Sequence, residues 1–155
     1  MRYAAILCLG VCAALAQPAE VQTLIAAGAG KAVALDGEYR IDNPIFITAD
    51  NTVIYGHATI VQTNPDADII RVENAKGVRI EGLTLTREAG KEDSTGSGVR
   101  AENCTRLELS DLHIVNNCSQ QGTVYLIKCE STVVRDCEIL NYKRVGVDDR
   151  TASEM

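Results

Sequence analysis

The sequence predicts an all-β fold, a right-handed parallel β-helix of about four coils with a short helix capping its N-terminal end. Three observations lead to this prediction. A pattern recurs about every 25 to 29 residues, apolar and polar residues alternate within each copy, and a glycine or aspartate recurs at one corner. The hydrophobic residues, 46% of the chain, include no Trp and one Phe, which favours stacked aliphatic layers.

The repeat is clearest when residues 71–85 are aligned with residues 100–114. Arginine, glutamate and asparagine coincide at the start of both copies, and so does every apolar position from Val78 onward. Residues 132–139 continue the pattern, and residues 52–60 begin it with one inserted residue. Because a unit of this size cannot bury its own apolar face, we expect successive copies to stack.

Each unit is expected to contain three short strands. The first two meet at a turn-forming residue, which in successive copies is Gly56, Gly82, Asp111 and Asp136. The third strands are expected at residues 45–47, 69–72, 98–101 and 124–127. A stack of hairpins would share the alternation, but it would not need three strands per period with a turn residue at one corner.

Alternation places one face of each strand inside the coil and the other outside. One interior ladder is expected from Ile54, Ile80, Leu109 and Val134. A second interior ladder is expected from Ile60, Leu85, Ile114 and Ile139. The outward positions of the first strands are then Arg79, Glu81, Glu108 and Arg135.

Residues 1–16 are interpreted as a secretion signal. Arg2 precedes an apolar run over residues 3–15, and residues 14–16 fit the small-x-small pattern of a signal-peptidase site. The alternative is a membrane anchor, but the run is well short of the roughly 20 residues that a helix needs to cross a bilayer. The mature protein is therefore expected to be secreted or periplasmic, with no membrane association after cleavage.

Residues 17–31 are expected to form the capping helix and a linker. Val21, Leu24 and Ile25 would make one apolar face, and Gly28 or Gly30 would end the helix.

The β-helix is expected over residues 32–155, beginning with strands near 33–35 and 39–41. Residues 145–148 resemble the third strand of a further coil, and the chain stops before the remaining strands of that coil. The expectation is therefore a β-helix truncated at its C-terminus.

The formal net charge is −6, with no basic stripe and no platform of aromatic residues. Nucleic acid is therefore not expected as a partner. The acidity also disfavours a strongly anionic glycan, unless a cation bridges the two.

Four cysteines follow the signal, namely Cys104, Cys118, Cys129 and Cys137. An even number in an oxidising compartment can mean disulfides, and the spacing is not a paired zinc pattern. Cys104 and Cys129 occupy nearly the same position one coil apart, so the expectation is a stacked thiol pair or a disulfide.

Two pairs of polar residues are assigned to the scaffold and the surface. Asn74 and Asn103 occupy successive turns, which favours a ladder of amides that satisfies turn backbone groups. His57 and His113 lie about two coils apart and are expected on the surface rather than on a shared metal.

Residues 32–41, 52–56 and 77–85 resemble the pectate-lyase/pectin-lyase-like superfamily, and the resemblance extends over about residues 30–150. The resemblance is specific for architecture and weak for activity, because the same coils carry lyases, hydrolases, epimerases and phage adhesins. In that superfamily glycans usually lie along the third strands. The resemblance therefore implies a substrate-binding face near Arg71, Arg100 and Tyr125, flanked by the loops 86–97 and 116–122.

The candidate catalytic residues are Asp148, Asp149 and Arg150, which follow a predicted strand on that face. Paired carboxylates can divide acid and base roles in glycoside hydrolysis, or they can hold Ca²⁺ for a lyase or epimerase. Lys143 and Arg144 are assigned to substrate binding, since cations near the base would stabilise enolate-like charge in an elimination.

The alternative to catalysis for Asp148 and Asp149 is a solvated pair of turn residues. The alternative for the surrounding Lys143, Arg144 and Arg150 is a salt-bridged surface cluster. Adjacent strand residues also point to opposite sides, so both carboxylates cannot simply face one substrate. The Asn-Thr-Asp, Gly-His-Gly and Arg-Ile-Lys signatures of polygalacturonase-like hydrolases do not occur.

The sequence thus predicts a secreted β-helix that acts on or binds polysaccharide, as the N-terminal part of a polysaccharide lyase or glycoside hydrolase. The alternative is a non-catalytic β-helix that binds glycan or serves as a scaffold.

Overall fold

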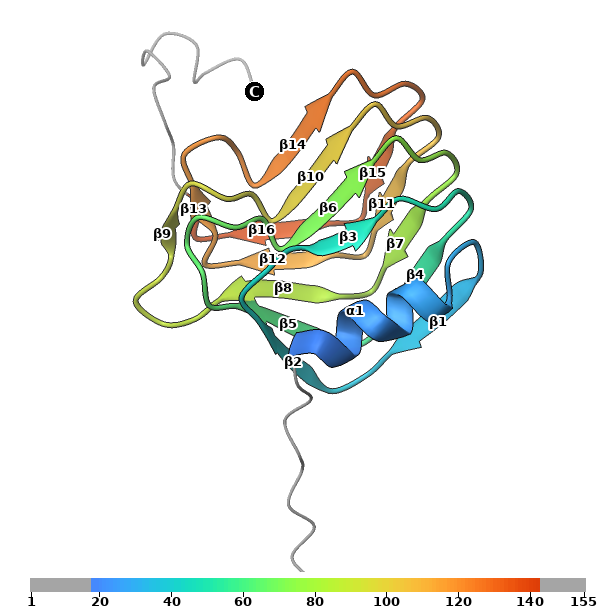
Figure 1. Ribbon diagram of the computed structural model, residues 1–155. Helices are drawn as coiled ribbons and strands as arrows, with labels where there is room; N and C mark the ends of the chain where they lie inside the picture. The colour runs from blue at the N-terminus through green and yellow to red at the C-terminus, as the bar shows by residue number, and fades with distance from the viewer. Residues whose placement is uncertain (1–17, 143–155) are drawn as a thin grey trace, which may run out of the picture.

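The computed structural model describes residues 18–142, and it is a parallel β-helix preceded by one short helix (Figure 1). The first sheet contains β1 (Ala32–Leu35), β4 (Val53–Gly56), β7 (Arg79–Glu81), β11 (Glu108–Ser110) and β15 (Val133–Arg135). The second contains β2 (Glu38–Ile41), β5 (Thr59–Gln62), β8 (Thr84–Arg87), β12 (His113–Val115) and β16 (Glu138–Leu140). The third contains β3 (Ile45–Ile47), β6 (Ile70–Glu73), β10 (Val99–Glu102) and β14 (Val124–Ile127).

A fourth, two-stranded sheet lies between the second and third sheets, where the longest loops run. It pairs β9 (Asp93–Ser94) with β13 (Cys118–Ser119), again in parallel. Each complete coil therefore contributes one strand to each main sheet, as the repeat predicted, and the stack has about four coils.

Both predicted interior ladders are confirmed by the strand register. Ile54, Ile80, Leu109 and Val134 are successive Cα partners across the first sheet. Ile60, Leu85, Ile114 and Ile139 are successive partners across the second. The first three members of each ladder are buried in one continuous core, because each lies between coils on both sides.

The recurring corner between the first two strands requires a left-handed backbone. Gly82 has φ +73°, and Asp111 and Asp136, its counterparts in the next two coils, have φ +52° and +55°. A Cβ atom at Gly82 would lie 2.5 Å from the carbonyl oxygen of Gly56. Glycine suits Gly82 because it adopts the left-handed conformation without strain and has no Cβ to meet that oxygen, and aspartate is one of the few other residues that adopt this conformation.

Helix α1 (Pro18–Ala27) contacts β2 and β3 at the N-terminal end of the stack. Val21 and Ile25 are buried against the core, but Leu24 is 42% exposed, so its assignment to the apolar face was wrong. Residues 21 and 25 are one turn apart, and Leu24 lies on the turn's outer side. The helix ends immediately before Gly28, as expected.

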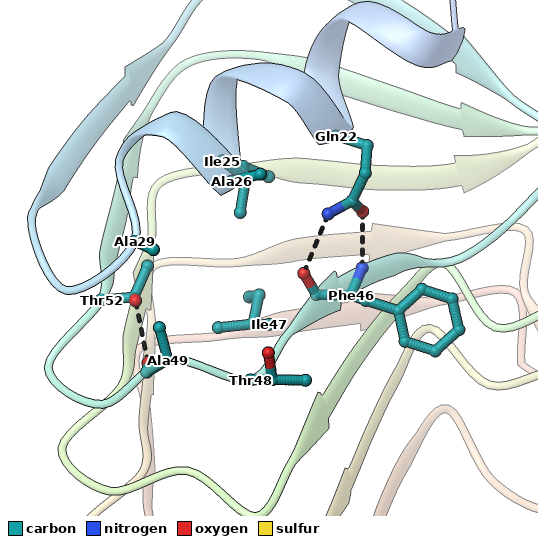
Figure 2. A pocket seen from close by; sticks show the side chains of 9 residues that line it. All are labelled: Gln22, Ile25, Ala26, Ala29, Phe46, Ile47, Thr48, Ala49 and Thr52. Atoms are coloured by element: carbon teal, nitrogen blue, oxygen red, sulfur yellow. Dashed lines mark hydrogen bonds between the residues drawn. The ribbon is translucent and has the colours of Figure 1, made fainter.

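Gln22 joins the helix to the free edge of the third sheet. Its Oε1 accepts a hydrogen bond of 2.8 Å from the Phe46 backbone N–H, and its Nε2 donates one of 3.2 Å to the Phe46 carbonyl (Figure 2). Because β3 is an edge strand, this amide takes the place of a neighbouring strand.

The opposite end of the stack is open within the part that the structure describes. Val134 continues the interior ladder, yet it is 46% exposed, and Leu126, Leu140 and Tyr142 are also exposed. The predicted strand at residues 145–148 and the predicted signal at residues 1–16 lie outside the described residues. No helix within residues 18–142 is long and apolar enough to cross a membrane.

Candidate functional site

The outer face of the third sheet carries a line of large side chains, one from each coil. Phe46 is the register partner of Arg71, Arg71 of Arg100, and Arg100 of Tyr125. Adjacent parallel strands are roughly 4.8 Å apart, so the four positions extend over roughly 14 Å. We call this line the aromatic–arginine ladder, and it brings together the predicted binding residues Arg71, Arg100 and Tyr125.

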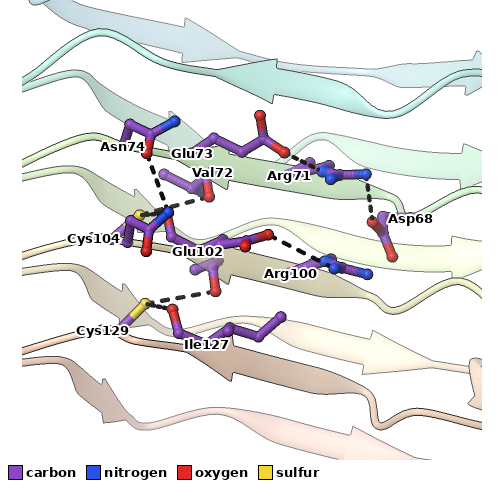
Figure 3. A network of polar contacts seen from close by, with 12 residues as sticks. Asp68, Arg71, Val72, Glu73, Asn74, Arg100, Glu102, Cys104, Ile127 and Cys129 are labelled. Carbon is purple, nitrogen blue, oxygen red and sulfur yellow. Dashed lines mark hydrogen bonds and ion pairs between the residues drawn. The ribbon is translucent and has the colours of Figure 1, made fainter.

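Ion pairs along each strand hold the two arginines. Arg71 Nε lies 2.5 Å from Glu73 Oε1, and Arg71 Nη1 lies 4.0 Å from Asp68 Oδ2 (Figure 3). Arg100 Nη2 lies 3.7 Å from Glu102 Oε2. Both arginines therefore have an acidic neighbour two residues further along the strand, on the same outward face.

Arg100 also contacts the aromatic end of the ladder. Its guanidinium carbon lies 5.5 Å from the centroid of the Tyr125 ring, within the range of a cation–π interaction. The buried Nε of Arg100 has no hydrogen-bond partner within the described residues, so its donors are only partly used.

A buried arginine organises the loops beside the ladder. Arg87, at the end of β8, is 3% exposed and donates to the Asn117 side-chain oxygen. It also donates to three backbone carbonyls, those of Asn64 at 2.9 Å, Ala67 at 3.0 Å and Gly96 at 2.7 Å. These acceptors lie in three successive loops, so one guanidinium fixes the loops relative to one another.

The charge of Arg87 is retained at neutral pH. Burial lowers the pKa of Arg87 from its usual value to about 10, and the nearby carboxylates of Asp68 and Asp66 oppose that shift. The group therefore stays protonated and keeps all its donors over the range in which proteins are usually handled.

Sequence reasoning missed both Phe46 and Arg87, although alternation marks both positions. Phe46 lies between two buried isoleucines of β3 and must point outward. Arg87 follows the buried Leu85 by two residues and must point inward, as does its register partner Gln62. A charged residue at an inward position was the signal for a buried polar network.

The remaining predicted site residues lie outside the part of the chain that is described. They are Lys143, Arg144, Asp148, Asp149 and Arg150. Within residues 18–142 no group of three or more His, Cys, Asp or Glu side chains is arranged to hold a metal ion.

The predicted stacking of Asn74 and Asn103 and the surface placement of the two histidines are confirmed. Asn103 Nδ2 donates to Asn74 Oδ1 at 3.2 Å, and both residues have a left-handed backbone, with φ +53° and +52°. His57 is exposed, and His113 points outward with Nδ1 3.1 Å from Glu138 Oε2. Neither pair contributes to the aromatic–arginine ladder.

Pockets within residues 18–142 lie near the helix and near the glycine corner. A pocket of about 220 Å³ lies between α1 and β3, lined mainly by Ile25, Ala26, Ala29 and Ile47, with Phe46 at its edge (Figure 2). A second, of about 180 Å³, lies at the glycine corner beside Tyr55, His57 and Glu81.

No protein-family model matches the chain, and no curated protein or solved structure matches it either. The class of protein is thus defined by the architecture alone, a parallel β-helix.

Proposed function

We propose that the protein binds a polysaccharide along the aromatic–arginine ladder, on the outer face of the third sheet. The observation that supports the proposal is the in-register line of Phe46, Arg71, Arg100 and Tyr125. Aromatic rings at its ends offer flat apolar surfaces for sugar rings, and the guanidinium groups between them offer donors for ring and hydroxyl oxygens. A rigid sheet keeps these groups at a constant spacing.

The charge of this face favours a neutral glycan over a polyuronate. Three carboxylates, those of Asp68, Glu73 and Glu102, accompany the two ladder arginines. The whole chain carries a formal net charge of −6. A polymer with a carboxylate on every sugar would therefore meet net repulsion, and a neutral polymer would not.

The broader assignment rests on the resemblance of residues 32–41, 52–56 and 77–85 to the pectate-lyase-like superfamily. On this basis we propose that the protein is secreted or periplasmic. We further propose that it is a lyase or hydrolase if Asp148, Asp149 and Arg150 complete a reactive centre. In that case the ladder would position the chain that is cut. A protein lacking such a centre would keep the same binding face.

Binding is tested by calorimetry or affinity electrophoresis of the full chain against matched neutral and uronate polysaccharides. Arg100→Ala and Tyr125→Ala should each weaken binding of a neutral glycan about tenfold or more, in the range of a buried interface contact. Arg135→Ala is the matched control, because Arg135 is an outward, ion-paired arginine on the first sheet. Equal effects of all three substitutions, or unchanged binding in the two ladder variants, would reject the ladder as the site.

Catalysis is tested separately on the same panel. Absorbance of unsaturated products reports a lyase, and reducing-end release reports a hydrolase. Loss of either activity in Asp148→Asn or Asp149→Asn with binding intact is the expected result. Full activity in both variants would remove these residues from the proposal.

A further inference from the structure

Cys104 and Cys129 are stacked in successive coils at the turn that follows the third strand. The next residues along the chain, Thr105 and Glu130, form a parallel bridge. The Glu130 N–H donates to the Cys104 carbonyl at 2.9 Å. The two cysteines are therefore register neighbours, with Cα atoms roughly 4.8 Å apart. That separation falls within the window of roughly 4.4 to 6.8 Å in which disulfides occur.

The two thiols have the same surroundings, one coil apart. Cys104 Sγ donates to the carbonyls of Val72 at 3.5 Å and Glu102 at 3.3 Å. Cys129 Sγ donates to the corresponding carbonyls of the next coil, those of Ala101 at 3.5 Å and Ile127 at 3.4 Å. Both sulfur atoms lie on the same side of their strands, one above the other (Figure 3).

The other two cysteines of the described region do not share this arrangement. Cys118 lies in β13, where its Sγ donates to the Asn141 carbonyl at 3.1 Å. Cys137 lies at the corner before β16, where its Sγ donates to the Arg135 carbonyl at 3.2 Å. Cys118 lies in the two-stranded sheet and Cys137 lies at a corner outside the strands, so each serves as a control for the stacked pair.

We propose that Cys104 and Cys129 are a modification site, at which a small disulfide such as oxidised glutathione converts the stacked thiols to an intrachain disulfide joining the third and fourth coils. All four cysteines of the described region are free thiols in the structure, which is thus the reduced form. The product would tie β14, which carries Tyr125, to β10, which carries Arg100.

Accessibility sets the order of the two steps. Cys104 is 1% exposed, and burial raises the pKa of its thiol, with a smaller contribution from the neighbouring Cys129. Cys129 is only half-buried, so its thiolate attacks the oxidised glutathione first and releases one glutathione thiolate. Cys104 then gives its proton to solvent, and its thiolate attacks Cys129 Sγ and releases the second glutathione.

The steps balance. Two protein thiols lose two protons and two electrons, and one glutathione disulfide becomes two glutathione thiols. Because the second step needs the Cys104 thiolate, ring closure should accelerate as pH rises from 7 to 9, and the Cys129 mixed disulfide should accumulate at the lower pH.

Peptide mapping of the full chain tests the proposal directly. Trypsin places Cys104 in residues 101–106, Cys129 in residues 129–135, Cys118 in residues 107–128 and Cys137 in residues 136–143. After oxidised glutathione at pH 8, the non-reduced digest should contain the first two peptides linked, and dithiothreitol should separate them. Cys118 and Cys137 should remain open to alkylation or carry only glutathione.

Two serine variants make the order testable. In Cys104→Ser, Cys129 should stop at the glutathione adduct, and in Cys129→Ser, Cys104 should remain a thiol. The oxidised wild type should melt roughly 5 to 10 °C above the reduced form, and neither variant should show this increase. Failure of residues 101–106 and 129–135 to link under these conditions would overturn the proposal, as would preferential linkage to Cys118 or Cys137. Glycan binding is not part of this readout.

Discussion

Replacement of Arg87 by methionine should destabilise the protein more than any change to a surface ion pair. Methionine has similar length and no donors, so four oxygen acceptors would lose their hydrogen bond to Arg87. The Asn64 and Gly96 carbonyls keep other donors, the Ala67 N–H and the Ser94 hydroxyl, whereas the Asn117 side-chain oxygen and the Ala67 carbonyl lose their partner. A buried acceptor without a partner costs about 1–3 kcal/mol. Removal of the buried charge offsets part of this loss, because its lowered pKa of about 10 reflects unfavourable burial.

The expected net loss is about 3–5 kcal/mol, the range observed when one partner of a buried charged network is removed. Arg40→Met is the control, because Arg40 pairs with Glu88 on the same side of the molecule and both side chains are more than a third exposed. An exposed pair contributes about 0–1 kcal/mol. Arg87→Lys should fall between the two, since one ammonium cannot reach all four acceptors.

Urea unfolding followed by far-UV circular dichroism measures these differences. The midpoint should fall in the order Arg40→Met, Arg87→Lys, Arg87→Met, at similar m-values. Indistinguishable midpoints for Arg87→Met and Arg40→Met would show that the three loops do not depend on the guanidinium, and the reasoning would be wrong.

Three further predictions concern the stack itself and are checked by the same unfolding measurements. Leu109→Ala should cost about 2–5 kcal/mol and Val134→Ala less than about 1 kcal/mol, because only the first side chain lies fully inside the core; equal losses would contradict the open end of the stack. Gly82→Ala should be at least about 1 kcal/mol worse than Gly37→Ala, since both have positive φ but only Gly82 would place its Cβ against a backbone oxygen; similar losses would mean that the coils do not approach closely there. Gln22→Ala should cost about 1–2 kcal/mol through the unpaired edge of β3; an unchanged midpoint would show that water replaces the amide.

The interior of the fold could be predicted because alternation in a strand directly reports which side chains point inward. Ile80 and Leu109 are aligned by that rule alone, and the structure pairs them. Alternation does not report whether a further coil covers a strand. The exposure of the inward-facing Val134 could therefore not be predicted from it. Leu24 was misplaced for a related reason, since the helix contacts the stack through a narrower stripe than its composition suggested.

The candidate site was only partly predictable. Arg71, Arg100 and Tyr125 share one position of the repeat, so stacking alone brings them together. Three of the four acceptors of Arg87 are backbone carbonyls of loops that have no common pattern, and a linear sequence carries no signal for such an arrangement. The inward position of Arg87 shows that partners exist, but only the packed loops identify them.

The most direct test of the binding face is an NMR titration of the isotope-labelled protein with a neutral oligosaccharide. We predict that the largest shift changes fall on Phe46, Arg71, Arg100 and Tyr125 and their strand neighbours on β3, β6, β10 and β14. The first-sheet residues Arg79 and Arg135, which also point outward and are ion-paired, should remain unchanged. Shifts centred on those two residues, or none with any oligosaccharide of the panel, would contradict the proposal that the aromatic–arginine ladder binds glycan.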